Sequence, residues 1–161
     1  MKHTNMENKE TRKELQVSAI ENGTVIDHIP VHAVFQVIRI LNLDEADDMV
    51  LFGNHLDSRK YGKKGIIKVS NKFFERKEIN KIALAAPSAS LIIIKNYKVV
   101  DKTVVEIPDH VENIVKCFNP NCITNHESIS PKFDVIKNED VLKLKCHYCE
   151  KTTSKENMVF V

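Results

Sequence analysis

Hydrophobic residues recur with two different periods along the first two thirds of the chain. Apolar runs that alternate with polar residues, or that are short and continuous, predict strands, whereas apolar residues three to four positions apart predict helices. By this criterion we expect strands over residues 15–20, 25–26, 49–52, 66–69, 91–94 and 99–107. Helical spacing occurs over residues 31–41 and again over 79–86, where Pro87 ends the pattern.

Polar segments separate these predicted elements. We expect a turn over residues 21–24, a polar and basic loop over 54–64, and a hairpin corner at Asn96 and Tyr97. The resulting order is strand, helix, strand, strand, helix, strand, with one additional strand at the end. This order is typical of the ferredoxin-like arrangement, an antiparallel sheet with two helices on one face. The other face of such a sheet stays free, and a free sheet face often forms a dimer.

The two ends of the chain differ from its middle. Residues 1–14 are charged and show no periodicity, which predicts a flexible N-terminal arm. Residues 108–161 contain only short strand-like runs, at 135–136 and 141–144. We therefore expect an α+β domain over 15–107, followed by a small all-β, zinc-ribbon-like domain over 108–161. About 50 residues are too few to form a large core unaided, so a metal ion is physically expected there.

All four cysteines lie in this last part and form two pairs. Cys117 and Cys122 have CxxxxC spacing, and Cys146 and Cys149 have CxxC spacing. Paired knuckles in a chain expected in the cytoplasm indicate ligands of one Zn²⁺ ion rather than disulfides. Four thiolates fill the coordination sphere of zinc and leave no position for a substrate water, so the predicted site is structural. A redox-active CxxC motif is the alternative, but it would leave the first pair unexplained.

Composition and charge exclude several classes of protein. The chain has 161 residues, of which 42% are hydrophobic and 29% are charged, as in ordinary globular proteins. The net charge of +2 does not by itself indicate nucleic acid, and a zinc ion with four thiolates would bring it close to zero. No apolar run is long enough to span a bilayer, and the N-terminal segment lacks the hydrophobic region of a secretory signal. We therefore expect a cytoplasmic protein without a membrane segment.

One local charge run stands out in the first domain. Five basic residues fall within ten positions that contain no acid, namely Arg59, Lys60, Lys63, Lys64 and Lys68. Lys68 and Lys102 can converge with Asp27 and His28 in a sheet of this order. Such a pocket suits a nucleotide, because lysines neutralise phosphates and a carboxylate accepts from ribose hydroxyls. The alternative is that the basic run is a solvated loop and that Asp27 caps the following helix.

The sequence contains none of the common catalytic motifs. There is no GxSxG, no P-loop, no GxGxxG and no HExxH. His126 and His147 lie beside the cysteines, and both are expected to be exposed loop residues rather than ligands. A metalloenzyme is therefore not favoured, because closed Cys₄ ligation leaves no open metal position.

Three separated motifs carry a resemblance to a known family. The first is Gly-Thr-Val-Ile-Asp-His-Ile over residues 23–29, followed by Pro30. The second is Asn96-Tyr97-x-Val99-Val100-x-Lys102, and the third is the CxxxxC and CxxC pair. With these motifs in this order, the chain resembles the regulatory chain of aspartate carbamoyltransferase from about residue 15 to its end.

The resemblance implies an allosteric subunit that is not itself an enzyme. Family members bind CTP, with UTP, as inhibitor and ATP as activator, and their zinc domain contacts the catalytic chains. Regulatory homodimers join two catalytic trimers in the holoenzyme that commits carbamoyl phosphate and aspartate to pyrimidine synthesis. The resemblance places the zinc ligands on the four cysteines. It places the effector pocket on Val17, Ala19, Ile20, Val25, Asp27, His28, Lys64, Lys68, Tyr97, Val99 and Lys102.

The chain departs from the family's pattern at two positions near this pocket. Ile92 stands where an asparagine is common, and Ser18 replaces an acidic residue of the first strand. The N-terminal arm is also several residues longer than is usual in the family.

The alternative function is a zinc-ribbon protein that binds nucleic acid, since a ribbon beside such a sheet also occurs in RNA-binding proteins. Two features disfavour it. The last part of the chain is slightly acidic, and the adjacent Phe73 and Phe74 would face opposite sides of a strand. We therefore expect no stacking platform for bases and no nucleic-acid partner.

Overall fold

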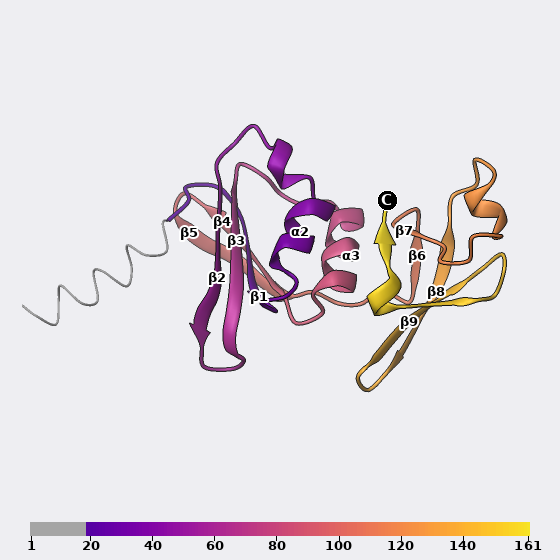
Figure 1. Cartoon of the computed structure of the whole chain (residues 1–161). Helices are drawn as coiled ribbons and strands as arrows, with labels where there is room; N and C mark the ends of the chain where they lie inside the picture. Colours follow the sequence, from indigo (N-terminus) through magenta and orange to yellow (C-terminus); the bar gives the residue numbers. More distant parts are fainter. Residues whose placement is uncertain (1–18) are drawn as a thin grey trace, which may run out of the picture.

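The fold is that of a computed structural model, which describes residues 19–161 (Figure 1). A five-stranded antiparallel sheet has the strand order β2-β3-β1-β4-β5. Its strands are β1 (Gly23–Ile29), β2 (Val50–Ser58), β3 (Gly62–Ser70), β4 (Ser90–Lys95) and β5 (Lys98–Val104). Helices α2 (Val34–Ile40) and α3 (Arg76–Ala85) lie together on one face of this sheet (Figure 1). The α+β, ferredoxin-like prediction is confirmed.

The C-terminal part is built from short strands. A four-stranded sheet has the order β10-β9-β8-β6, and β11 pairs with β7. The strands are β6 (His110–Glu112), β7 (Val115–Lys116), β8 (Lys132–Asn138), β9 (Val141–Cys146), β10 (Thr152–Ser154) and β11 (Val159–Phe160). Residues 19–161 also contain three single turns of 3-10 helix, at Leu43–Glu45, Ile123–Asn125 and Lys155–Asn157.

The predicted limits of several elements are corrected. Strand β1 begins at Gly23 and runs to Ile29, so the expected turn over 21–24 is shorter, and Ala19 and Ile20 lie outside any strand. Residues 15–18 of the expected first strand, and the arm over 1–14, lie outside the described residues. The first helix is shorter than the predicted 31–41, because residues 31–33 form a turn after Pro30.

The loop predicted over residues 54–64 is instead a β-hairpin. Strand β2 continues to Ser58, and β3 begins at Gly62. The two strands pair Asp57 with Lys63, whose Nζ lies 2.6 Å from the Asp57 carboxylate. This end of the hairpin is polar on both faces because it is largely exposed, so it lacks the alternation that predicts a strand.

The two apolar faces of the large sheet are unequal. The main core lies between the sheet and the helices, where Ile26, Ile67 and Val34 are fully buried. A smaller apolar cluster of Ile20, Val25 and Ile94 lies away from this core. The five-stranded sheet therefore has one face covered by helices and a second face, here called the open sheet face.

Helix α3 also packs against the C-terminal part. Leu84 is fully buried in the same cluster as Val115, Phe133 and the cysteines, and Phe160 of β11 packs against both cores. Lys81 Nζ donates to the carbonyl oxygen of Val161 at 2.9 Å. Figure 1 shows β11 beside α3, between the large sheet and β8–β9. No helix within residues 19–161 has the length and apolarity needed to cross a membrane.

Replacing Leu84 by Ala should destabilise the chain by about 2–5 kcal/mol, because the cavity would open in the contact between α3 and the C-terminal part. Chemical denaturation of the metal-loaded chain measures this loss. Leu56→Ala is the matched control, since Leu56 lies half-buried on the edge hairpin and should cost much less. Equal losses of unfolding free energy in the two variants would contradict a stabilising contact between α3 and the C-terminal part.

Candidate functional site

The four cysteine sulfur atoms meet in one cluster. Their Sγ atoms all lie within 4.8 Å of one another. Cys117 and Cys149 are 3.7 Å apart, as are Cys122 and Cys146. Four sulfurs around a tetrahedral Zn²⁺, with Zn–S bonds of about 2.3 Å, are separated by about 3.8 Å. The two knuckles therefore have the spacing of a metal site, and all four cysteines are free thiols.

Backbone and amide groups hold the two knuckles in place. Asn125 Nδ2 donates to the carbonyl oxygens of Cys117 at 3.0 Å and Asn119 at 2.7 Å. The Glu150 amide donates to the Cys146 carbonyl, and Thr124 Oγ1 lies 3.2 Å from the Cys122 sulfur. The cysteine spacing does not reveal these hydrogen-bond partners, because they meet the knuckles only once the turns have folded.

The protonation of the thiols depends on their burial. Burial raises the pKa of the Cys117 and Cys146 thiols. Burial also raises the pKa of the less buried Cys149, but hydrogen bonds from the Lys151 backbone and the Asn119 side chain bring it down to about 7. Buried thiolates need a compensating cation, and a divalent metal that displaces the protons supplies it.

The two nearby histidines are not part of the cluster. A ring nitrogen of His126 lies 2.7 Å from the carbonyl oxygen of Pro120. His147 is exposed and makes an edge-to-face contact with Tyr148, with 5.1 Å between ring centroids. Within the described residues, only the four cysteines converge as a possible metal site.

A second candidate site follows the register of the large sheet. Lys68 of β3 pairs with Val25 of β1, Val25 pairs with Ile92 of β4, and Ile92 pairs with Lys102 of β5. Side chains directly opposite one another in antiparallel strands share a face. These four residues, here called the lysine row, therefore cross the open sheet face with a lysine at each end and an apolar centre.

Asp27 and its neighbours flank the lysine row. Asp27 lies two residues along β1 from Val25 and so shares its face. Its carboxylate is 2.8 Å from Lys64 Nζ and also accepts from the His28 amide at 2.7 Å. Lys68 is only 7% exposed, and burial lowers its pKa, while the Asp27 charge opposes this shift.

The hairpin corner between β4 and β5 lies on the other side of the lysine row from Asp27. The Tyr97 amide donates to the Glu21 carbonyl at 2.9 Å, and the Asn96 amide donates to Asn22 Oδ1 at 3.1 Å. Ile94 pairs with Val99 and packs with Ile20. From Ile94's partner Gly23 to Asp27, the site spans about 14 Å along β1.

The structure thus gathers most of the predicted effector residues on or beside one sheet face. Val17 lies outside the described residues, and Ala19 is exposed at their beginning. One neighbour was not predicted. Tyr61 of the β2–β3 connection makes an edge-to-face contact with His28, with 5.8 Å between ring centroids. The sequence gives no signal for this contact, because 33 residues separate the two rings.

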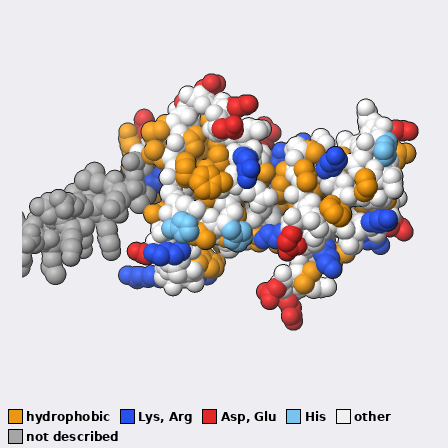
Figure 2. Space-filling view, viewed as in Figure 1, with side chains coloured by type: hydrophobic (Ala, Val, Ile, Leu, Met, Phe, Trp, Pro, Cys, Tyr) orange, Lys and Arg blue, Asp and Glu red, His pale blue; other side chains and the backbone are white. Residues whose placement is uncertain are grey.

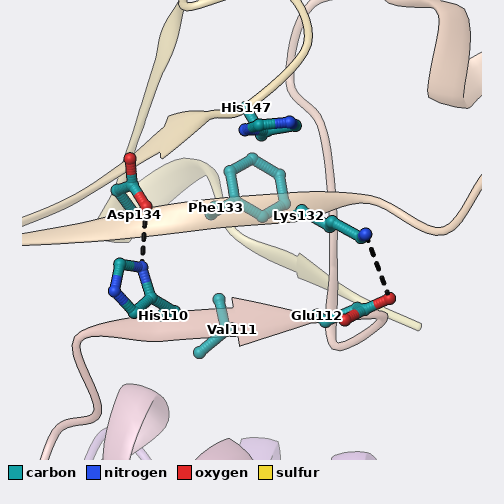
Figure 3. A pocket seen from close by; sticks show the side chains of 7 residues that line it. All are labelled: His110, Val111, Glu112, Lys132, Phe133, Asp134 and His147. Atoms are coloured by element: carbon teal, nitrogen blue, oxygen red, sulfur yellow. Dashed lines mark hydrogen bonds and ion pairs between the residues drawn. The ribbon is translucent and has the colours of Figure 1, made fainter.

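A third feature is a surface hollow of about 360 Å³ between β6, β8 and the second knuckle (Figure 3). Its charged side chains are paired across the strands. His110 Nδ1 lies 2.7 Å from Asp134, and Lys132 Nζ lies 3.8 Å from Glu112. Figure 3 shows the His147 ring beside Phe133. None of the cysteines lines this hollow.

The aromatic residues do not form a platform for bases. Strands β1 and β3 at the centre of the sheet carry no Phe, Tyr or Trp. Phe73 and Phe74 lie in the connection between β3 and α3, and Phe74 packs against the helix-covered core. This arrangement does not favour the nucleic-acid alternative.

Two family models of the same kind of protein together match nearly the whole chain. The family model described as "Aspartate carbamoyltransferase regulatory chain, allosteric domain" matches residues 15–106. The model described as "Aspartate carbamoyltransferase regulatory chain, metal binding domain" matches residues 109–159.

Curated relatives with the same description are similar over most of their length. The aspartate carbamoyltransferase regulatory chain of Pyrococcus furiosus is 53% identical over 148 residues, which cover 91% of this chain and 97% of that protein. The regulatory chain of Thermococcus sibiricus is 54% identical over 147 residues, 91% of this chain and 96% of that protein. The chain of Parabacteroides distasonis is 48% identical over 150 residues, 93% of this chain and 97% of that protein.

Replacing Cys122 by Ser should abolish stoichiometric metal binding and unfold the C-terminal part, because three ligands would remain on a module whose core includes the cluster. Metal content after dialysis and the thermal unfolding of the two parts measure this. His126→Gln is the control and should keep one metal ion per chain. Loss of metal in His126→Gln would mean that the ligand set is not the four cysteines.

Proposed function

The chain belongs to the family of aspartate carbamoyltransferase regulatory chains, non-catalytic subunits with an allosteric and a metal-binding domain, and from this premise we propose that its open sheet face binds nucleotide effectors. The observation that carries the proposal is the lysine row, with Asp27 beside it. The domain responsible comprises residues 15–107, and residues 108–161 form the metal domain.

The chemistry of the open sheet face suits a nucleotide. Lys102 and Lys68 supply positive charge for phosphates, and Val25 and Ile92 form an apolar floor between them. The Asp27 carboxylate accepts hydrogen bonds from ribose hydroxyls. Backbone groups near the corner at Tyr97 can read a base. Following the family resemblance, the effectors are CTP and UTP as inhibitors and ATP as activator.

Regulation requires an effector to bind two quaternary states with different affinity. We infer that nucleotide binding changes the packing of α3 against the C-terminal part, where Leu84 and Phe160 lie. The metal domain then favours one arrangement of the catalytic trimers. The pathway served is de novo pyrimidine synthesis, and the compartment is the cytoplasm, where thiols remain reduced for metal binding.

The metal domain is proposed to hold one structural Zn²⁺ through Cys117, Cys122, Cys146 and Cys149. Four sulfur ligands in tetrahedral spacing favour zinc over magnesium or calcium, which take oxygen ligands. Large side chains around the knuckles are exposed, namely Phe118, Ile123 and Tyr148. Exposed apolar residues grouped in this way mark a protein-binding surface, and the proposed partner is the catalytic chain.

Nucleotide binding to the metal-loaded chain should depend on Lys102 of the lysine row and on Asp27 beside it. Lys102→Ala and Asp27→Ala should each weaken CTP and ATP binding about tenfold or more, because each removes a charge-assisted contact. Isothermal calorimetry measures this. Lys143→Ala, which removes an exposed lysine of β9, should leave the affinity unchanged. Unchanged binding in both site variants would refute the placement of the pocket.

Removal of the metal should separate the two proposed roles of the chain, nucleotide binding and assembly with the catalytic chain. Chelation should abolish assembly with catalytic trimers, because the docking module unfolds, while CTP binding to the large sheet survives. Sizing chromatography with purified trimers and parallel calorimetry measure the two effects. An intact holoenzyme after complete metal removal would contradict a docking role for the metal domain.

We propose that the chain also forms a homodimer through the β2 edge. Strand β2 has one neighbouring strand within residues 19–161, so its outer backbone groups are available for pairing. Phe35, Met49 and Phe52 are each at least half exposed beside this edge, and the two phenyl rings are 5.6 Å apart. This apolar patch is a suitable centre for a stable contact.

Charge favours an antiparallel pairing of two β2 strands. Four acids precede β2, namely Asp44, Glu45, Asp47 and Asp48, and four bases follow it, namely Arg59, Lys60, Lys63 and Lys64. A twofold axis through β2 places the acidic end of one strand beside the basic end of the other. Figure 2 shows hydrophobic side chains between an acidic group above and basic side chains below.

Phe52→Asp should convert the dimer to a monomer, because it places a charge in the centre of the apolar patch. Sedimentation velocity of the metal-loaded chain measures the change. Val141→Asp is the matched control, since Val141 is 48% exposed on the β8–β9 hairpin. A dimer that persists in Phe52→Asp would show that the interface does not lie at the β2 edge.

A further inference from the structure

A short linker, residues 105–109, connects the large sheet to the C-terminal part. Strand β5 ends at Val104, and β6 begins at His110. Lys102 of the lysine row lies on β5, three residues before the linker begins. The linker is therefore the covalent path from the open sheet face to the metal domain.

The first residue of the linker is fixed to the large sheet. Val105 is buried in the core between the sheet and the helices. Its amide donates to the carbonyl oxygen of Ala89 at 3.0 Å, directly before β4 begins. A displacement of β4 or β5 therefore displaces Val105 with it.

Strand β8 of the metal domain holds the remainder of the linker. Ile107 packs against the metal-domain core, and its carbonyl oxygen accepts from Lys137 Nζ at 2.6 Å. The same Nζ lies 3.7 Å from the Asp109 carboxylate. The Asp109 carbonyl oxygen accepts from the Val135 amide at 2.8 Å. One lysine side chain and one backbone amide of β8 thus contact two linker residues, an arrangement here called the linker clamp.

The linker has little freedom to bend outside one position. A charged pair closes its far end, where His110 Nδ1 lies 2.7 Å from the Asp134 carboxylate across β6 and β8 (Figure 3). Within the linker, the ring of Pro108 fixes its own φ near about −65°. Glu106 is exposed, and it alone separates Val105 in one core from Ile107 at the other. Bending between the two domains is therefore restricted to the backbone around Glu106.

We propose that the linker clamp makes residues 107–110 a rigid part of the metal domain, so that a displacement of β5 moves the metal domain directly. An exposed ion pair contributes little by itself, but here a charge-assisted hydrogen bond, a backbone hydrogen bond and a proline act on consecutive residues. Without the clamp, the linker would absorb the displacement by changing its backbone angles.

This connection is separate from the packing of α3 against the metal domain. It gives Lys137 a positioning role, because its ammonium group contacts the linker and lies on neither proposed binding surface. The clamp itself follows from the contacts of β8. Only its use in regulation, through Lys102 on β5, rests on the proposed nucleotide-binding function.

Hydrogen exchange of the full metal-loaded chain, followed residue by residue by NMR, tests the clamp without any nucleotide. In Lys137→Met, the Val135 amide should exchange about tenfold faster or more, because the loss of a hydrogen bond from a charged group changes a local opening equilibrium by about this factor. Amides between β8 and β9 should change less than about twofold, since that ladder remains paired.

Lys143→Met is the matched control, because it removes an exposed lysine from β9 of the same hairpin. It should leave the exchange of the Val135 amide unchanged. An unchanged Val135 amide in Lys137→Met would show that the lysine does not hold the linker, and it would overturn the proposal.

The regulatory use of the clamp is tested in the holoenzyme assembled with catalytic trimers. Lys137→Met should reduce the effect of CTP on activity about twofold or more, as mutations along a coupled path do. A second variant, with two glycines inserted between Glu106 and Ile107, should reduce it as well, because it lengthens the linker and leaves Lys137 in place. Calorimetry should give an unchanged CTP affinity in both variants, and thermal melting and sizing verify folding and assembly.

The outcomes separate the clamp from the nucleotide function. A full CTP effect in the glycine-insertion variant would show that the signal bypasses the linker, and it would overturn the regulatory role. Absence of CTP binding to the unmodified chain would refute the proposed nucleotide function, whereas the exchange of the Val135 amide would still decide whether β8 clamps the linker.

Discussion

The convergence of four sulfur atoms is the constraint on which the C-terminal third depends. Three of the four cysteines are themselves members of the buried cluster that includes Val115, Phe133 and Leu144. The strands around them have two to seven residues, and such short strands do not form a stable core by themselves. A metal ion bound by the four sulfurs would hold this module closed, and because Leu84 of α3 belongs to the same core, it would also fix the helix against the module.

On the open sheet face, the cost of burying a lysine charge is set against its attraction to a nearby carboxylate. Burying Lys68 is unfavourable for its charge, and Asp27 offsets part of that cost. In the proposed nucleotide site, a phosphate would add negative charge beside both lysines of the row. The two lysines with Val25 and Ile92 between them give this face positive charge around an apolar floor, which suits the anion proposed to bind there.

The site residues differ in how far the sequence predicted them. The metal cluster was recognisable because the cysteines carry both the chemistry and the spacing, so two short motifs suffice. The order of strands and helices followed from hydrophobic periodicity, which is strong where one face of an element is buried, as in α2 and α3. The hairpin from β2 to β3 was predicted as a loop because its tip is exposed on both faces. The two lysines of the row were expected to converge from the strand order, whereas Val25 was assigned to the pocket only by the family resemblance, and the alignment of all four residues needed the register.

Contacts between distant turns were beyond sequence reasoning. Tyr61, His32 and Ser88 share no sequence motif, yet they line one surface hollow, near which Gly65 permits β3 to approach α2 closely. Packing contacts that the sequence does not reveal also connect the open sheet face with the metal domain. Ile26 alternates with Val25 and Asp27 along β1, so a ligand that displaces β1 from the open face also displaces the core against α3. Helix α3 contacts both that core and, through Leu84, the metal-domain core. A shift of the sheet would therefore move an element that packs against the metal domain. A densely packed core transmits such strain instead of absorbing it, and under the proposed function this contact is the link between a nucleotide on the open sheet face and a partner bound by the metal domain.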